Sequence, residues 1–80
     1  MTSLSKLIPS ETWINASDGL EKCSITCIPE YRLQFYESAS EPTIENPAKL
    51  PDVTTVFEGT GDDIWVYNQF DIDVTIQVDG

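Results

Sequence analysis

The clearest alternation of apolar and polar residues lies near the end of the chain. Ile72, Val74, Ile76 and Val78 occupy every second position there, and the residues between them are polar. Because successive side chains of a β-strand point to opposite sides, this stretch predicts a strand with one apolar and one polar face. Residues 64–67 (IWVY) predict another strand. The link of residues 68–71 is long enough for a turn, so we expect a hairpin that supplies one wall of a β-sheet core.

Similar, shorter alternations precede this hairpin. They predict strands in residues 11–16, 21–28, 31–37 and 53–58. Within these strands the residues expected to face inward include Cys23, Ile25, Cys27, Tyr31, Leu33 and Phe35. Tyr36 then lies on an outer face, where a single exposed aromatic residue can mark a contact surface. Both tryptophans, Trp13 and Trp65, are interpreted as core and rim residues of a small β-domain.

Two segments are less regular. Residues 3–8 carry Leu4, Leu7 and Ile8, and they predict a short first strand or an N-terminal arm that ends at Pro9. Residues 38–52 (SASEPTIENPAKLPD) contain three prolines and no alternation, which predicts a long surface loop. Loops of this length tend to be functional or mobile. Ile44 and Leu50 are the apolar residues expected to hold this loop against the domain.

Together these elements predict a single all-β domain over residues 1–80. We expect a small antiparallel β-sandwich or barrel of about six to seven strands, because no segment shows an apolar period near 3.6. Residues 1–10 would form the arm or edge strand, and residues 38–52 the Pro-rich loop. A domain of this size buries a small core, and association with a partner is one way to stabilise it.

The charge of the chain restricts its partners. Four basic residues against 14 acidic ones give a net charge of -10 and a pI near 4.1. This balance argues against binding to a nucleic-acid backbone or to an anionic membrane, since both require cationic side chains. No apolar run approaches the ~18 residues of a membrane span, and there is no signal-peptide core. We therefore expect synthesis and retention in a cytosol-like compartment.

No group of residues predicts catalysis, a cofactor or a metal site. The chain has no histidine, so Ser-His-Asp and Cys-His arrangements are excluded. Cys23 and Cys27 would lie about 13 Å apart on one strand, too far to form a disulfide, and two thiolates are too few for a structural zinc. We interpret both as buried, reduced residues. Asp62-Asp63 fits a turn better than a calcium site, and the glycosylation acceptor at Asn15-Ala16-Ser17 is interpreted as a chance match.

The order of several motifs along the chain also resembles that of a known group of proteins. The strand Tyr31-x-Leu33-x-Phe35-Tyr36 continues into residues 37–42 (ESASEP), and a proline-bearing loop and an apolar strand follow. Residues 59–68 (GTGDDIWVYN) and the terminal Val74-x-Ile76-x-Val78 complete the pattern. Over roughly residues 21–78 the chain resembles the short β-sandwich proteins encoded among the virion genes of tailed bacteriophages.

The resemblance implies a non-enzymatic structural protein of the phage particle, such as a capsid decoration or cement protein or a tail accessory subunit. Its implied location is the virion, after synthesis in the host cytoplasm. Such proteins commonly act as multimers, often trimers, so the expected partners are virion proteins and further copies of the chain. The residues expected to contact them are Leu4, Leu7, Ile8, Tyr36, Ile44 and Leu50.

Two alternatives remain open at this stage. A small acidic protein can mimic DNA and occupy a basic groove on a host enzyme. A β-sandwich can also bind carbohydrate through exposed Trp or Tyr, as a module of a phage tail.

Overall fold

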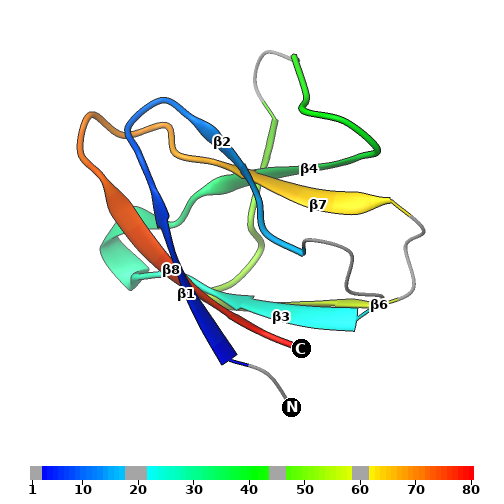
Figure 1. Ribbon diagram of the computed structural model, residues 1–80. Helices are drawn as coiled ribbons and strands as arrows, with labels where there is room; N and C mark the ends of the chain where they lie inside the picture. Colours follow the sequence, from blue (N-terminus) through cyan, green and yellow to red (C-terminus); the bar gives the residue numbers. More distant parts are fainter. Residues whose placement is uncertain (1–2, 18–21, 44–46, 59–61) are drawn as a thin grey trace.

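Eight β-strands, divided equally between two sheets, account for most of the computed structural model, which describes residues 3–17, 22–43, 47–58 and 62–80 (Figure 1). The strands are β1 (Ser3–Ile8), β2 (Trp13–Asn15), β3 (Lys22–Thr26), β4 (Gln34–Ser38), β5 (Ala48–Lys49), β6 (Thr54–Glu58), β7 (Asp63–Tyr67) and β8 (Val74–Asp79). A single 3₁₀ turn, Pro29–Tyr31, precedes β4. The all-β prediction is confirmed.

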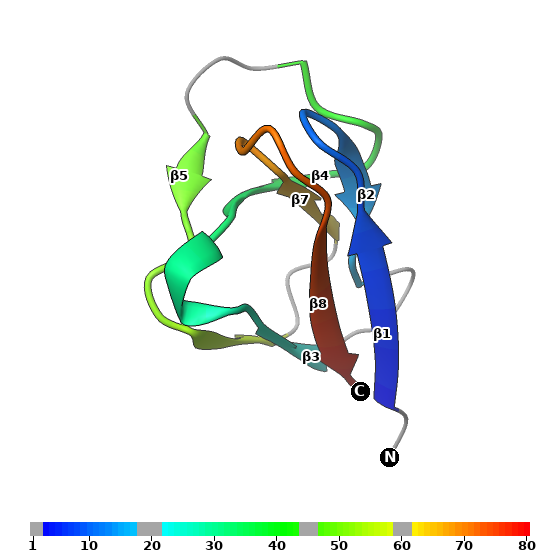
Figure 2. The same cartoon turned by 90° about the vertical axis from the view of Figure 1, so that its left-hand side faces the viewer.

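The two sheets are built by nested antiparallel pairing. Sheet A has the strand order β1-β8-β3-β6 and sheet B the order β2-β7-β4-β5. The first strand pairs with the eighth, the second with the seventh, the third with the sixth and the fourth with the fifth. The strand pairs are thus nested like those of one long hairpin, and the strands lie in two layers (Figures 1 and 2). This is the topology of an eight-stranded jelly roll.

Two details of the predicted strands were wrong. The structure has one strand more than the upper prediction, because β5 lies within the stretch predicted as loop and pairs with β4 through Phe35–Ala48 and Gln34–Lys49. In addition, β7 and β8 are neighbours in sequence but not a hairpin, since β7 belongs to sheet B and β8 to sheet A. The link between them crosses from one layer to the other.

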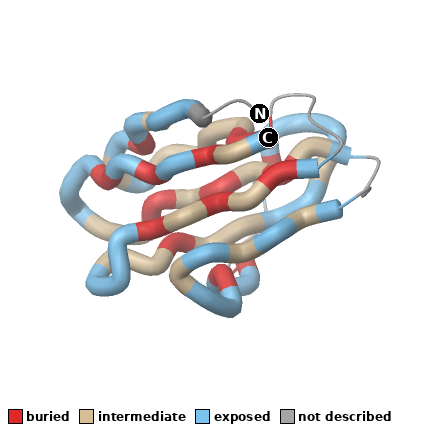
Figure 3. Tube along the Cα trace, turned by 90° about the horizontal axis from the view of Figure 1, so that it is seen from below, coloured by how far each residue is buried: buried red, intermediate tan, exposed pale blue. Residues whose placement is uncertain are grey.

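Alternation along the strands builds the core between the sheets. Figure 3 shows buried and exposed residues following one another along the chain. The buried apolar residues are Ile8, Ala16, Cys23, Ile25, Cys27, Leu33, Leu50, Ile64, Val66, Val74, Ile76 and Val78. Phe35 of β4 meets Phe57 of β6 across the two layers, with ring centroids 5.3 Å apart. The apolar face predicted for Val74, Ile76 and Val78 is therefore one wall of this core.

The segment between β4 and β6 is attached more closely than a free surface loop. Leu50 is fully buried, and its backbone N–H donates to the Leu33 carbonyl at 2.9 Å. Pro42 and Pro47 are also buried. Ile44, the other apolar residue expected to hold this segment, lies outside the described residues.

A buried asparagine closes one end of the sandwich. The Asn68 side-chain amide donates to the carbonyls of Ile8 and Ile72 at 3.0 and 2.6 Å, and its oxygen accepts from the Phe70 N–H at 2.9 Å. Its backbone exchanges hydrogen bonds with Glu11 and Thr12. Asn68 thus fixes the start of the β7–β8 crossover against the β1–β2 connection, and its amide supplies donors to the Ile8 and Ile72 carbonyls.

Candidate functional site

The outer face of sheet B carries a cluster of four aromatic side chains. In β7, Ile64 and Val66 point into the core, so Trp65 and Tyr67 point outward. The register places Trp13 of β2 opposite Tyr67, and Tyr36 of β4 opposite Trp65. We call Trp13, Tyr36, Trp65 and Tyr67 the aromatic cluster. Both tryptophans of the chain belong to it.

The aromatic cluster is partly exposed. Tyr36 is 41% exposed, and the other three members are half-buried. The rings of Trp13 and Tyr67 lie 5.1 Å apart and are inclined at 44°, so these two do not form one flat platform. The indole Nε1 of Trp65 donates to the Ser38 carbonyl at 3.1 Å, which fixes the orientation of its ring. Both tryptophans were interpreted as core and rim residues. In the structure both lie on the outer face, so they are rim residues.

Polar side chains border the cluster. The register puts Gln34 beside Tyr67 and Asn15 beside Trp65 on the same outer face. Asn15 Nδ2 donates to Asp63 Oδ2 at 2.8 Å, and Ser17 Oγ lies 3.4 Å from Asp63 Oδ1. Ser17 is buried, and its Oγ accepts from the Ile64 N–H at 2.9 Å. The Asn15-Ala16-Ser17 tripeptide therefore has a structural role in holding β2 against β7.

The outer face of sheet A is different, because its middle is uncharged. The outward residues there are Ser5 and Leu7 of β1, Thr75 and Gln77 of β8, Ser24 and Thr26 of β3, and Thr54 and Val56 of β6. Leu7 and Val56 are each 57% exposed, and Ile28, which follows β3, is 41% exposed. Half of the large exposed apolar residues among those described therefore lie on or beside this face.

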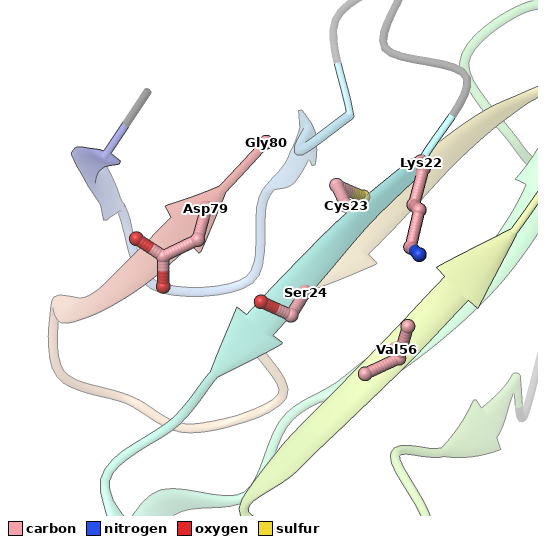
Figure 4. A pocket seen from close by; sticks show the side chains of 6 residues that line it. All are labelled: Lys22, Cys23, Ser24, Val56, Asp79 and Gly80. Atoms are coloured by element: carbon pink, nitrogen blue, oxygen red, sulfur yellow. The ribbon is translucent and has the colours of Figure 1, made fainter. Parts of the chain in front are cut away.

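Small side chains leave two shallow hollows on this face. One, of about 230 Å³, lies over Thr26, Thr75 and Gln77 and is bordered by Ile28. The other, of about 310 Å³, lies where Ser24 separates Asp79 from Val56 (Figure 4). The first hollow is lined by no charged side chain, whereas Lys22 and Asp79 border the second. We assign no catalytic role to either hollow.

Carboxylates surround these faces and do not cover them. Most of those described lie in the links between elements, as Glu11 and Asp71 do, or at strand ends, as Glu58, Asp63 and Asp79 do. Glu37 is an exception, one residue before the end of β4. Lys22 Nζ lies 3.1 Å from Glu58 Oε1, in an exposed ion pair. Within the described ranges, no group of three or more Cys, Asp or Glu side chains is arranged to hold a metal ion.

Both cysteines are free and buried in the structure. Burial raises the pKa of the Cys23 thiol above its ordinary value of 9.0, against a smaller opposing effect of Lys6. Burial also raises the pKa of Cys27, against the hydrogen bond with the Leu33 backbone and the charge of Arg32. A thiol is nucleophilic only as the thiolate, so both residues are held in their unreactive form.

The structure separates the six residues expected to contact partners. Leu4, Leu7 and Tyr36 are exposed, at 46%, 57% and 41%. Ile8 and Leu50 are corrections, because both are fully buried and belong to the core. Ile44 lies outside the described residues.

Sequence reasoning missed the exposure of Val56 and Ile28. It was wrong on Ile72, which was expected on the apolar face of the last strand but is exposed in the link before β8. The alternation in residues 53–58 contains Val56, but it does not show which of the two sets of side chains faces out. The clustering of Trp13 with Trp65 also depends on the pairing of β2 with β7, which local sequence does not indicate.

Comparisons of the chain with protein-family models, with curated proteins and with solved structures find no match. Over the part of the chain that the structure describes, no helix has the length and apolar content needed to cross a membrane. The fold and the two outer faces are therefore the structural features that bear on function.

Proposed function

We propose that this chain is a non-enzymatic structural subunit of a bacteriophage particle, most simply a capsid decoration or cement protein. In this proposal it binds the protein shell through the outer face of sheet A. The observation that carries the proposal is the contrast between that face, which is uncharged in its middle, and the net charge of -10.

This contrast fits a protein-contact surface. Charged residues are depleted from the centres of protein interfaces, while the polar rim stays solvated. The exposed side chains of Leu7, Ile28 and Val56 supply apolar area at this face. Its remaining residues are short hydroxyl side chains and Gln77, which cost little to desolvate when they find hydrogen-bond partners.

The topology and the small size of the domain are consistent with this role. The jelly roll occurs in viral capsid domains, although also in lectins and cupins, so the fold alone does not select among them. A domain of 80 residues gains stability when a partner binds its folded form. The resemblance to small virion proteins of tailed phages favours the particle over the other settings.

The test is the composition of the purified particles of the phage that encodes this chain. We expect quantitative mass spectrometry to find the chain in a fixed ratio to a major virion protein. Leu7→Glu should reduce the number of bound copies, because it adds charge to the uncharged face. Ile72→Glu is the matched control, since Ile72 is 43% exposed but lies in the β7–β8 link. Particles that lack the chain would contradict the proposal.

A second function is favoured by the aromatic cluster. Trp and Tyr rings on a sheet face, bordered by the amide of Gln34, offer stacking surface and hydrogen bonds to a neutral glycan. A tail accessory module with this property would attach the particle to its host. The scattered carboxylates, by contrast, do not favour the mimicry of DNA, which needs them along one face.

Because both tryptophans belong to the cluster, intrinsic fluorescence reports on it directly. We expect a glycan ligand to shift the emission of the wild-type chain, and Tyr36→Ala to weaken binding at least about tenfold. Ile72→Ala is the control, because Ile72 has a similar exposure but lies away from the cluster. A glycan array without any binding would remove this candidate.

A further inference from the structure

The edges of the two sheets differ in how they are protected. A strand at the edge of a sheet presents unpaired N–H and C=O groups, and short strands make poor templates for another chain. The edges of sheet B are β2, with three residues, and β5, with two. The edges of sheet A are longer, with six residues in β1 and five in β6.

The edge strand β1 contains a protective charge. Lys6 pairs with Ile76, so its side chain leaves the strand on the core side of sheet A. Its Nζ donates to the Asn15 carbonyl of β2 at 3.0 Å. An inward-pointing charge at an edge is one of the devices that prevent edge-to-edge pairing.

The edge strand β6 has no such protection. Its five residues, Thr-Thr-Val-Phe-Glu, are mainly β-branched or aromatic, which favours an extended backbone. All five pair with β3 in an unbroken register, so no bulge turns the strand away. Among the described strands β3 is its one partner, and the opposite side of β6 is the open edge of sheet A.

We propose that β6 pairs antiparallel with β6 of a second copy of this chain, about a two-fold axis at Val56. Sheet A would then continue through both copies as one sheet of eight strands. Val56 lies opposite Val56 of the second copy, Thr55 opposite its Phe57, and Thr54 opposite its Glu58. The same surface serves both copies, as a two-fold interface requires.

Charge disfavours two competing arrangements, the register centred on Thr55 and a parallel pairing. Residues opposite each other in a strand pair have their side chains on the same side of the sheet. The two-fold axis can therefore move from Val56 to the next residue only if every residue still faces one whose side chain lies on the same side. A two-fold axis at Thr55 would place Asp52 opposite Glu58 of the second copy. A parallel, in-register pairing would stack Glu58 on Glu58. Like charges directly opposite each other destabilise a sheet, whereas the Val56-centred register opposes none.

The side chains at the centre of this pairing suit burial. Val56 is 57% exposed in the single copy, and its contact with its counterpart would remove apolar surface from water. Glu58 is already paired with Lys22 of β3, which lowers its repulsion of a second acidic copy. This pairing is a property of the chain alone and is independent of the proposed phage role.

Self-association of the purified 80-residue chain tests the proposal. We expect sedimentation velocity to show a dimer that grows between about 10 µM and about 1 mM, in about 0.15 M NaCl to screen repulsion. Val56→Lys should weaken the association at least about tenfold, because Lys protects an edge. Leu7→Lys is the matched control, with the same 57% exposure on the same face but on β1. A chain that stays monomeric, or an equal loss in both variants, would overturn the proposal.

A cysteine scan tests the register and guards against misfolding of the lysine variant. Opposed residues in an antiparallel pair have Cα atoms about 4.5–5.5 Å apart, within reach of a disulfide. Val56→Cys should therefore cross-link to itself under mild oxidation. Thr54→Cys should not, because it lies opposite Glu58 of the second copy. The native Cys23 and Cys27 are buried and remain free in both variants. Equal cross-linking at positions 54 and 56 would contradict the Val56-centred pairing.

Discussion

At the residue scale, the side-chain amide of Asn68 connects the two sheets at one end of the sandwich. Asn68 is fully buried, and its side chain makes three hydrogen bonds: one with the Ile8 carbonyl of β1 and two with the backbone of Phe70 and Ile72 in the β7–β8 link. An asparagine supplies two donors and an acceptor from one planar group, and an apolar residue of similar size would leave carbonyls unsatisfied. The end of the sandwich therefore depends on its chemistry as well as on its volume.

Asn68→Ala should destabilise the fold strongly. It removes three hydrogen bonds and leaves the carbonyls of Ile8 and Ile72 without their donors, at a cost of about 3 kcal/mol. Urea unfolding followed by circular dichroism measures this change through the midpoint and slope of the transition. Thr75→Ala, at an exposed position on β8, is the control and should cost less than about 1 kcal/mol. Equal losses in both variants would contradict the role given to Asn68.

The buried thiols should make stability depend on pH at the alkaline side. Their pKa values are raised by burial in the folded state, so above their ordinary value of 9.0 the unfolded chain loses thiol protons that the folded chain retains. The free energy of unfolding should therefore fall as the pH rises beyond about 9 towards the folded pKa values. The double variant Cys23→Ala and Cys27→Ala should show a shallower fall in urea titrations at a series of pH values. Identical slopes would show that the thiols do not contribute.

At the element scale, local alternation could predict the strands but not their partners. The seven segments predicted as strands or arm all contain strands, because a period of two is a property of each segment alone. The pairing of β1 with β8 joins residues more than 60 positions apart, and no local signal indicates it. The expected β7–β8 hairpin is absent for the same reason. Local sequence shows that each of the two strands has an apolar face, but it does not show which sheet each strand joins.

The candidate surfaces could be predicted only in part, for a related reason. Tyr36 and Leu7 were recognised from their positions, but the aromatic cluster forms only when β2, β7 and β4 become neighbours. Ile8 and Leu50 were named as partner contacts because their segments were interpreted as an arm and a loop, but both lie in the core. β5 was not predicted because its segment is rich in proline and because its two residues are too few to show alternation.

The segment between β4 and β6 should be a structural element rather than a dispensable loop. Leu50 is fully buried and hydrogen-bonds to Leu33, so Leu50→Ala should cost about 3 kcal/mol through lost burial and the cavity left behind. Leu7→Ala, the same change at a side chain 57% exposed, should alter stability by less than about 0.5 kcal/mol. Urea unfolding of the two variants compares them directly. A small loss for Leu50→Ala would mean that the segment is not packed as described.

At the scale of the whole molecule, negative charge is placed where it does not interfere with the faces. Among the described residues, carboxylates lie mainly in links and at strand ends, where their repulsion opposes close approach of two copies, while the middle of the outer face of sheet A stays uncharged. A net charge of -10 on a molecule with a radius of gyration of 11.3 Å also opposes the compact state itself. Any partner that neutralises or screens these charges should therefore stabilise both the fold and its assembly.

Salt should consequently raise the thermal stability of the single chain. Increasing NaCl from about 20 mM to about 500 mM shortens the screening length from roughly 20 Å to roughly 4 Å, which is less than the size of the molecule. We expect Tm to rise by several degrees, equivalent to about 1 kcal/mol for a domain of this length. Differential scanning calorimetry at low protein concentration, where a dimer does not form, measures the effect. The triple variant Glu30→Gln, Glu41→Gln and Asp71→Asn changes exposed carboxylates in three separate links, so it should be more stable at low salt and respond less to added salt. A wild-type Tm that stays constant or falls with salt would show that mutual repulsion is not what limits the stability of this fold.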